Sequence, residues 1–283
     1  MKKTGGLIQC NYQTYPRWDI TSPLLPPHSR LFRLKPVGLG TAKVESLSSY
    51  LNRLAEAHCV SPHSLLCKII FPSVREGISH YSHTFGYQGI QVNGMGTIAD
   101  ITATGLERLT LRQGLRYMTT MPWKNVLSPL YLLRPYKAWC VTCYDEQLRN
   151  KKTFYEPLIW AINAVSICPL HYERLCQICP HCNRSIAVLS VFSRVGCCSR
   201  CRNWLGALYA TGSGQNSARS VSDIELTQQI PIIHSISELL AHAPSLASMP
   251  SNQSFIANLT YYIEKEAGNN INLGASLEQL HVF

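Results

Sequence analysis

The sequence predicts a mainly α-helical protein with small zinc-stabilised modules made of β and loop segments. Apolar residues recur at helical spacing in the N-terminal half and after residue 222, and four closely spaced pairs of cysteine and histidine lie between residues 140 and 201. Prolines break the segments around these pairs. The chain of 283 residues is long enough to bury a hydrophobic core. The pattern divides it into an extended arm, a helix-turn-helix domain, a tandem zinc-finger domain, a linker and a C-terminal helical segment, over residues 1–36, 37–133, 134–206, 207–221 and 222–283.

The first 36 residues are predicted to form the extended arm. No helical period appears there, and five prolines deny the segment helical hydrogen bonds: Pro16, Pro23, Pro26, Pro27 and Pro36. Cations and aromatic residues are mixed in the arm, which suits contact with a partner or with the protein's own surface. We favour its own domain, because Leu31, Phe32 and Leu34 need burial.

Two helices joined by a tight turn are predicted over residues 44–71. From Leu47 to His58, apolar side chains recur at positions i, i+3, i+4 and i+7 of the first helix. Ser61 suits the N-cap of the second helix and Pro62 suits its first position. Four apolar residues of the second helix share one side and four others share the opposite side: Leu65, Leu66, Ile69 and Ile70 against His63, Ser64, Cys67 and Lys68. Helices joined in this way are typical of a helix-turn-helix, and an ordinary helical hairpin is the alternative.

A third helix is predicted around residues 104–119, from leucines at helical spacing: Leu106, Leu109, Leu111 and Leu115. Residues 72–104 show weak periodicity, and His80 and His83 within them are interpreted as loop histidines.

The part of the chain after the cysteine pairs is predicted to be a linker followed by helices. Glycine and serine are frequent from residue 211 to residue 220, which is typical of a flexible linker. Two helical patterns follow it: Ile232, Ile236, Leu239 and Leu240, then Phe255, Leu259, Tyr262 and Ile263. The last residues look like the start of an element, so we expect a longer natural protein with a further DNA-binding module.

Eight side chains of metal-binding types lie in four pairs, each with two residues between its members: Cys140 and Cys143, Cys168 and His171, Cys179 and Cys182, Cys198 and Cys201. This spacing lets both side chains of a pair reach one ion from a single turn. The four pairs therefore predict two tetrahedral zinc sites, one of three sulfurs and one imidazole and one of four sulfurs. Protein fills every position of each site, which predicts structural and not catalytic zinc.

The pairing of these ligands has alternatives. Fifteen residues separate the third pair from the fourth, a usual length, whereas 24 separate the first from the second. Sequential pairing is favoured over a cross-braced arrangement. Cys176 competes with the third pair and Cys197 with Cys198. The cysteines outside the pairs are interpreted as small buried apolar residues: Cys10, Cys59, Cys67, Cys176 and Cys197.

Positive charge lies on the same part of the chain as the cysteine pairs. Residues 1–206 contain 24 lysines and arginines against 10 aspartates and glutamates, whereas residues 207–283 contain 2 against 6. This distribution favours a polyanionic partner, most plausibly nucleic acid. No signal peptide and no stretch of 18 apolar residues is present. We therefore expect a cytoplasmic protein with no membrane contact, in which clustered cysteines bind metal instead of forming disulfides.

An enzyme is the least supported class of function. The 16 acidic residues form no evident cluster of metal-binding carboxylates, and residues 38–43 lack the spacing of a phosphate-binding loop. The paired cysteines are better explained as ligands than as nucleophiles. We expect no catalytic residues, which leaves a DNA-binding protein and a protein-binding adaptor as the alternatives.

Several stretches resemble the TniQ family. Residues 45–55 look like the entry helix of TniQ-family proteins, and residues 139–205 resemble their paired zinc modules in motif order, spacing and flanking tryptophans. The resemblance covers roughly residues 30–206. It departs at Cys59, where the family's helix-turn-helix turn often carries glycine. A left-handed backbone at that position costs a non-glycine residue roughly 1–2 kcal/mol.

The resemblance implies a role in transposition and DNA integration. The family includes the target-selecting TnsD proteins and the adaptors of CRISPR-associated transposons. Such proteins mark the insertion site and recruit the AAA+ regulator TnsC, in the bacterial cytoplasm and on the nucleoid. A TnsD-type member binds double-stranded DNA at an attachment site, whereas an adaptor sits on an RNA-guided Cascade-type complex.

Direct DNA binding is favoured over the adaptor role. Five side chains are candidate DNA contacts, on the second helix and beside the last cysteine pair: His63, Ser64, Lys68, Arg200 and Arg202. Lys68 is the single fixed positive charge on the recognition face, and a DNA-reading helix usually shows more Arg, Asn or Gln there. The adaptor alternative therefore stays open.

Overall fold

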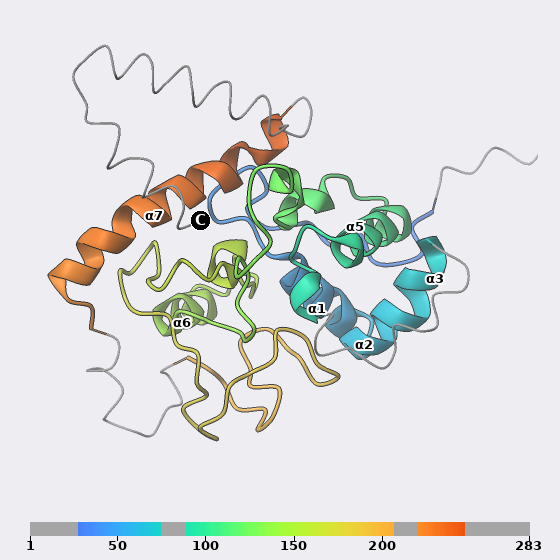
Figure 1. Ribbon diagram of the computed structural model, residues 1–283. Helices are drawn as coiled ribbons and strands as arrows, with labels where there is room; N and C mark the ends of the chain where they lie inside the picture. The colour runs from blue at the N-terminus through green and yellow to red at the C-terminus, as the bar shows by residue number, and fades with distance from the viewer. Residues whose placement is uncertain (1–27, 75–88, 207–219, 247–283) are drawn as a thin grey trace, which may run out of the picture.

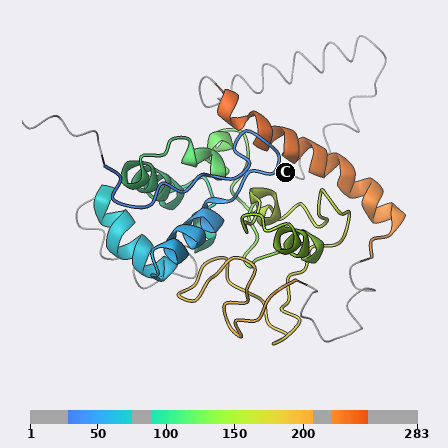
Figure 2. The same cartoon turned by 180° about the vertical axis from the view of Figure 1, so that it is seen from behind.

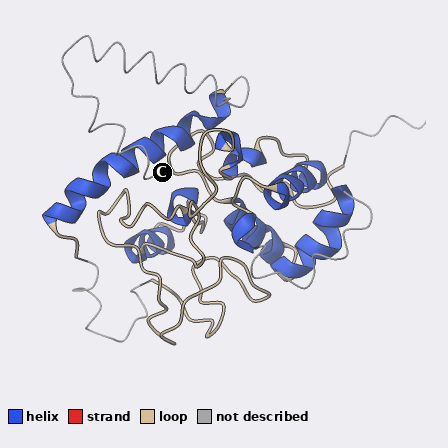
Figure 3. Ribbon diagram, in the orientation of Figure 1, coloured by secondary structure: helices blue, strands red, loops and turns tan. Residues whose placement is uncertain are grey.

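The structure is a computed structural model that describes residues 28–74, 89–206 and 220–246. The described residues form helices and loops, and no strand is drawn among them (Figure 3). Pairing between their extended segments is limited to isolated bridges, such as the one between Trp139 and Cys176. The mainly helical fold with two small metal-binding modules is confirmed. The modules are built from one helix, loops and bridges, without regular strands in the described part.

The helices form two groups that share one core. Their bounds are α1 Leu47–Ala57, α2 Pro62–Leu65, α3 Phe71–Val74, α5 Thr97–Thr110, α6 Val141–Arg149 and α7 Asp223–His242. The first four lie on one side of the molecule, and α6 with the loops that follow it lies on the other (Figures 1 and 2). One continuous cluster of buried side chains runs through both groups, so the predicted helical and zinc-finger domains pack as one body.

The predicted first helix and the turn after it are confirmed. Ser46 is the N-cap of α1, and its hydroxyl accepts the backbone N–H of Ser49 at 3.2 Å. The helix ends at His58, and Cys59 then adopts a left-handed backbone with a φ of 54°. The turn therefore keeps the geometry that favours glycine, although a cysteine occupies it.

The second helix begins as predicted, with Ser61 as N-cap and Pro62 in its first turn, but it contains a π-helical segment. That segment, η1 (Leu66–Ile70), lies between α2 and α3. Buried apolar pairs recur five residues apart, at Leu65–Leu66 and Ile70–Phe71, instead of four. As a consequence Ile69, which the α-helical pattern placed on the buried side, is 41% exposed.

The third predicted helix is out of place, because α5 spans Thr97–Thr110 and not residues 104–119. Leu111 takes a left-handed φ of 53° and ends the helix, and Leu115 belongs to a separate 3₁₀ turn, η3 (Leu115–Met118). At the other end Gly96 is the N-cap and makes no side-chain bond. The helix was misplaced for two reasons. Its start at residue 96 carries no capping side chain, and Leu111 and Leu115 continue the helical spacing of leucines beyond its end.

Residues 28–36 of the arm lie along the protein's own helical domain, as favoured. Leu31 is buried, and its N–H donates to the carbonyl of Leu109 at 3.0 Å. Phe32 is 55% exposed and stacks on His58 with ring centroids 4.3 Å apart. Residues 1–27 of the predicted arm lie outside the described residues.

Helix α7 packs against the first metal-binding module instead of standing apart from it (Figure 1). Gln229 accepts the backbone N–H of Ser166 at 2.9 Å, and Glu225 pairs with Arg174 at 2.5 Å. Ile233 and Leu240 are buried in the common core. Residues 207–219 of the predicted linker, the helix around Phe255–Ile263 and the loop histidines His80 and His83 lie outside the described residues. Within the described residues, no helix has the length and apolar content to cross a membrane.

Backbone bonds join the start of α1 to the segment before η5 (Leu158–Ala161). The N–H of Ser46 donates to the carbonyl of Glu156 at 2.9 Å, and the N–H of Leu158 donates to the carbonyl of Val44 at 2.8 Å. The carboxylate of Glu156 is buried, and it accepts Lys137 at 2.7 Å and the hydroxyl of Tyr144 at 2.8 Å. Burial and this carboxylate raise the pKa of Tyr144 well above its usual value.

The left-handed turn generates a first prediction. Replacing Cys59 with glycine is expected to stabilise the protein by about 1 kcal/mol, because glycine adopts a positive φ without the cost that a side chain brings. The measurement is the midpoint of chemical denaturation. Cys59→Ala is the control, since it removes the thiol and keeps the Cβ, and its midpoint should stay at the wild-type value. A glycine variant no more stable than the alanine variant would contradict the prediction.

Candidate metal centres and nucleic-acid surface

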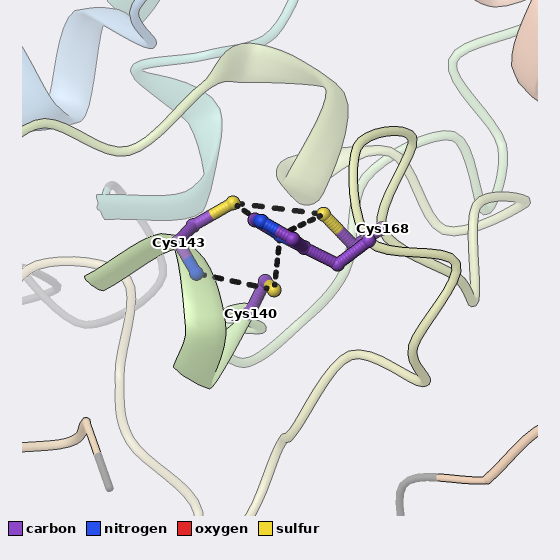
Figure 4. Close-up of side chains that lie close together, drawn as sticks. Cys140, Cys143 and Cys168 are labelled. Carbon is purple, nitrogen blue, oxygen red and sulfur yellow. Dashed lines mark hydrogen bonds between the residues drawn. The ribbon is translucent and has the colours of Figure 1, made fainter. Parts of the chain in front are cut away.

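The first cluster brings together Cys140, Cys143, Cys168 and His171. Sγ of Cys143 lies 3.6 Å from Sγ of Cys168, and Nδ1 of His171 lies 3.3 to 3.7 Å from the three sulfurs. The sulfur atoms of the three cysteines labelled in Figure 4 point toward one another. All four ligand atoms lie within 4.8 Å of one another. The first and second pairs of the sequence therefore form one site.

The second cluster brings together Cys179, Cys182, Cys198 and Cys201. Sγ of Cys179 lies 3.7 Å from that of Cys201, and Sγ of Cys182 lies 3.8 Å from that of Cys198. In a tetrahedron with metal–sulfur bonds of about 2.3 Å, neighbouring sulfurs lie about 3.8 Å apart. Both clusters have this spacing, so each can hold a metal ion, and the dimensions are compatible with zinc.

Both choices between neighbouring cysteines are settled by the clusters. Cys176 and Cys197 lie outside both sites, and the cross-braced arrangement is not formed. The interpretation of the spare cysteines as buried is wrong for Cys59, which is exposed on the turn, whereas Cys67, Cys176 and Cys197 are half-buried. Cys10 lies outside the described residues.

Three of the four pairs sit on one recurring loop, which we call a knuckle. In each knuckle the N–H of the fourth residue after the first cysteine donates to that cysteine's carbonyl, at 2.8 to 2.9 Å. The residues at this position all have left-handed backbones: Tyr172, Asn183 and Arg202. The first cysteine's own N–H donates in turn to the carbonyl five residues on, at 2.8 to 3.0 Å. The knuckle thus closes the loop and turns both ligands inward.

The remaining pair begins a helix. Cys140 is the N-cap of α6, where its sulfur accepts the N–H of Cys143 at 3.4 Å. N–H groups at a helix N-terminus stabilise negative charge on a capping atom, which suits a thiolate ligand. The first site therefore combines a helix start with a knuckle, whereas the second combines two knuckles.

Three ionised sulfurs in the first site would favour a cation between them. Hydrogen bonds from Cys140 and Cys168 raise the pKa of the Cys143 thiol, because three sulfurs this close do not all ionise without a positive charge between them. His171 directs Nδ1 at the sulfurs and Nε2 at Glu146, 3.2 Å away. Burial alone would lower the pKa of His171, but its contacts with Cys168 and Glu146 raise it overall. A carboxylate on the outer nitrogen orients a histidine that binds metal through the inner one.

A tryptophan at the end of the second cluster joins the two modules. The ring of Trp204 packs against Tyr144 and Phe154, with centroids 5.5 and 5.3 Å away. Gly196 has a φ of 75°, and a Cβ at this glycine would overlap the Trp204 ring. The sequence analysis noted tryptophans that flank the cysteine pairs, whereas the contact of Trp204 with Gly196 is visible only in the structure.

The predicted DNA contacts fall into two places on the surface. Lys68 is exposed on the second helix, whereas His63 and Ser64 are half-buried. The hydroxyl of Ser61 donates to that of Ser64 at 3.0 Å, so Ser64 takes part in the cap of the helix. Arg200 and Arg202 are exposed beside the second cluster, and the guanidinium of Arg202 lies 5.0 Å from the ring centroid of Phe192.

A groove of about 400 Å³ lies between the helix-turn-helix turn and the second module. Cys59, Val60, Ser61 and Pro62 line it from the turn, and the module contributes a second wall: Val191, Phe192, Ser193, Arg194, Cys197, Cys198 and Arg202. Arg194 pairs with Glu56 of α1 across it at 2.6 Å. The start of the second helix and Arg202 therefore border one groove, although 140 residues separate Pro62 from Arg202.

The two clusters lead to a prediction on metal content. Replacing Cys198 with serine is expected to reduce the bound metal from two ions per chain to one and to unfold the second module, because a structural metal supplies about 10–16 kcal/mol of apparent free energy. The adjacent substitution Cys197→Ser should leave both ions in place. Metal content by mass spectrometry and Trp204 fluorescence provide the measurements. Equal metal content in the two variants would overturn the assignment of ligands.

The contact between Gly196 and Trp204 gives a further prediction. Gly196→Ala should lower the thermal unfolding midpoint of the second module strongly, because it adds an overlap with the ring to the cost of a left-handed backbone. Gly40→Ala is the matched control, since Gly40 has a φ of 77° and open space around it. That variant should lose only the roughly 1–2 kcal/mol of the backbone term. Equal losses would show that the Trp204 ring moves aside.

Residues 36–175 match the family model TniQ. The match contains the helix-turn-helix helices and the whole of the first cluster, and it ends before Cys179, so the second cluster lies outside it. A search of curated proteins found no match. The entry helix and the first metal-binding module that resembled the family thus lie inside the region that the model covers. The chain belongs to the TniQ family of transposition-associated proteins.

Proposed function

We propose that the protein selects the target site of a transposon by binding double-stranded DNA and recruiting the AAA+ regulator TnsC. The TniQ match supports a role in a transposition complex. The observation that carries DNA binding is the groove between the helix-turn-helix turn and the second module. This groove places Arg202, beside the last cysteine pair, next to Pro62 at the start of the second helix.

Charge and exposure on this surface support nucleic acid as the partner. Arg200, Arg202 and Lys68 are exposed, and they belong to a region with 24 basic and 10 acidic residues. In a helix-turn-helix, residues near the start of the second helix contact base edges, and cations around them bind phosphate. In this proposal His63 and Lys68 contact base edges, and Arg200 and Arg202 bind phosphate.

Zinc is the metal that we propose for both clusters. Sites of three sulfurs with one imidazole and of four sulfurs are typical of structural zinc, and protein atoms fill all four positions. No position then remains for an activated water, so we propose a non-enzymatic protein. We also propose that it acts in the cytoplasm and on the nucleoid, where its DNA target lies.

An adaptor on an RNA-guided Cascade-type complex is the second candidate function, favoured by exposed apolar residues on the same surface. Ile69 is 41% exposed beside Lys68, and Val60 and Phe192 are exposed at the groove. Apolar and aromatic side chains of this kind are typical of protein-binding surfaces. The adaptor would recruit TnsC with little DNA affinity of its own.

The two functions are separated by the salt dependence of DNA binding. The wild-type protein should bind duplex DNA from the suspected insertion locus with a slope of log K against log salt of roughly −4.5, as expected for about five phosphate contacts. The variant Arg200→Gln with Arg202→Gln should reduce the magnitude of this slope by about 1.8. Fluorescence anisotropy on specific and scrambled duplex measures both values.

The controls identify which function holds. Arg149→Gln with Lys152→Gln removes the same charge from exposed positions at the end of α6 and just after it, and should leave the slope unchanged. A flat salt response of the wild-type protein, together with capture of TnsC and of the Cascade-type complex, would replace direct DNA binding with the adaptor function.

A further inference from the structure

A second group of cations gathers where the arm meets the end of α5. The N–H of Leu31 donates to Leu109, and the guanidinium of Arg112 donates to the carbonyls of Arg33 and Leu34. Six basic residues flank these contacts, and we call them the arm face: Arg30, Arg33, Lys35, Arg108, Arg112 and Arg116. All are exposed except Arg112, which is half-buried.

The arm face has little opposing charge. Residues 28–43 contain no acidic residue, and residues 101–118 contain Glu107 alone. A carboxylate oxygen of Glu107 accepts the N–H of Leu115 at 2.8 Å. Among the described residues, none of the six cations forms an ion pair. The arm face is therefore a concentrated positive surface with which no described carboxylate forms an ion pair.

Only some of these cations stabilise helix ends. Arg108 donates to the carbonyl of Ser73 at 2.7 Å, and Arg33 donates to that of Leu111 at 3.4 Å, so each neutralises the end of a helix. A guanidinium has five N–H donors, which leaves most of them available. Arg30, Lys35 and Arg116 have exposed side chains next to these contacts.

The position of the arm face relative to the second helix suggests its partner. Pro62, at the start of that helix, lines the groove beside Arg202, and Ser73, near its end, bonds Arg108 of the arm face. A helix of this length spans roughly 18 Å. The major groove of DNA is about 12 Å wide, with a phosphate backbone on each side. A helix lying across it would bring one cationic group to each backbone.

We propose that the arm face binds the phosphate backbone of duplex DNA on the side opposite to the second metal-binding module. The two cationic groups then hold the second helix from both ends. The arm is already fixed at α5 by hydrogen bonds from the Leu31 backbone and the Arg112 side chain, so its cations lose less conformational freedom on binding than those of a free arm would. This inference rests on the proposed DNA binding, and it adds a contact surface that lies outside the helix-turn-helix and the modules.

The test is a charge-neutralising triple variant, Arg30→Gln, Arg33→Gln and Lys35→Gln. It leaves Arg112 and the backbone bonds that anchor the arm in place. If each cation contacts one phosphate, the magnitude of the salt slope should fall by about 2.7, because each contact contributes about 0.9. Affinity should fall equally for specific and scrambled duplex, since phosphates carry no sequence information.

The matched control removes three exposed cations at the end of α6 and just after it, as Arg149→Gln, Lys151→Gln and Lys152→Gln. It should keep the wild-type slope and affinity, and both variants should stay folded with the wild-type metal content. An unchanged slope in the arm variant, or an equal loss in the control, would overturn the inference alone. A wild-type protein with a flat salt response would instead remove the proposed DNA binding and the arm contact with it.

Discussion

In the zinc-bound protein that we propose, closure of the two four-residue clusters is the constraint on which residues 134–206 depend. The described backbone there is paired at isolated bridges and within three knuckles, without a sheet. Fixing each residue costs about 1–2 kcal/mol of conformational entropy, which scattered pairs of this kind do not offset. A structural metal supplies roughly 10–16 kcal/mol per site. Burial of Trp139, Tyr144 and Trp160 between the clusters and the helical group adds the apolar contribution that a sheet would otherwise provide.

The helix-turn-helix and the metal-binding modules depend on each other through buried polar contacts. Glu45 at the start of α1 pairs with Arg53 at 2.6 Å, and the hydroxyl of Ser49 accepts the N–H of Glu156 at 3.0 Å. Glu156 in turn holds Lys137 of the first module. Removing one partner of such a buried pair leaves an uncompensated charge, which is strongly destabilising. These contacts therefore fix the start of α1 against residues 137–156.

Local signals in the sequence predicted the features that depend on neighbouring residues. Ser46, Ser61 and Pro62 marked helix starts, and the two-residue spacing of the cysteine pairs identified all eight clustered ligands. Features that depend on distant packing were not predictable. The five-residue step from Leu65 to Ile70 reflects packing of the helix against α5 and the core. A prediction that assumes the regular α-helical period of about 3.6 residues does not include such a step. The groove beside Arg202 and the arm face both form from segments far apart in the chain. Whether these surfaces bind DNA stays a prediction.

The bonds between α1 and residues 156–158 also set an order for folding during synthesis. The hydroxyl of Ser49 accepts the N–H of Glu156, which lies 107 residues further along the chain. At about 5–20 residues per second, a ribosome delivers that partner roughly 5–20 s later. Throughout this interval the nascent helical group lacks the segment that covers the start of α1. The helical group is thus completed only after the first cysteine pair, Cys140 and Cys143, has already been synthesised.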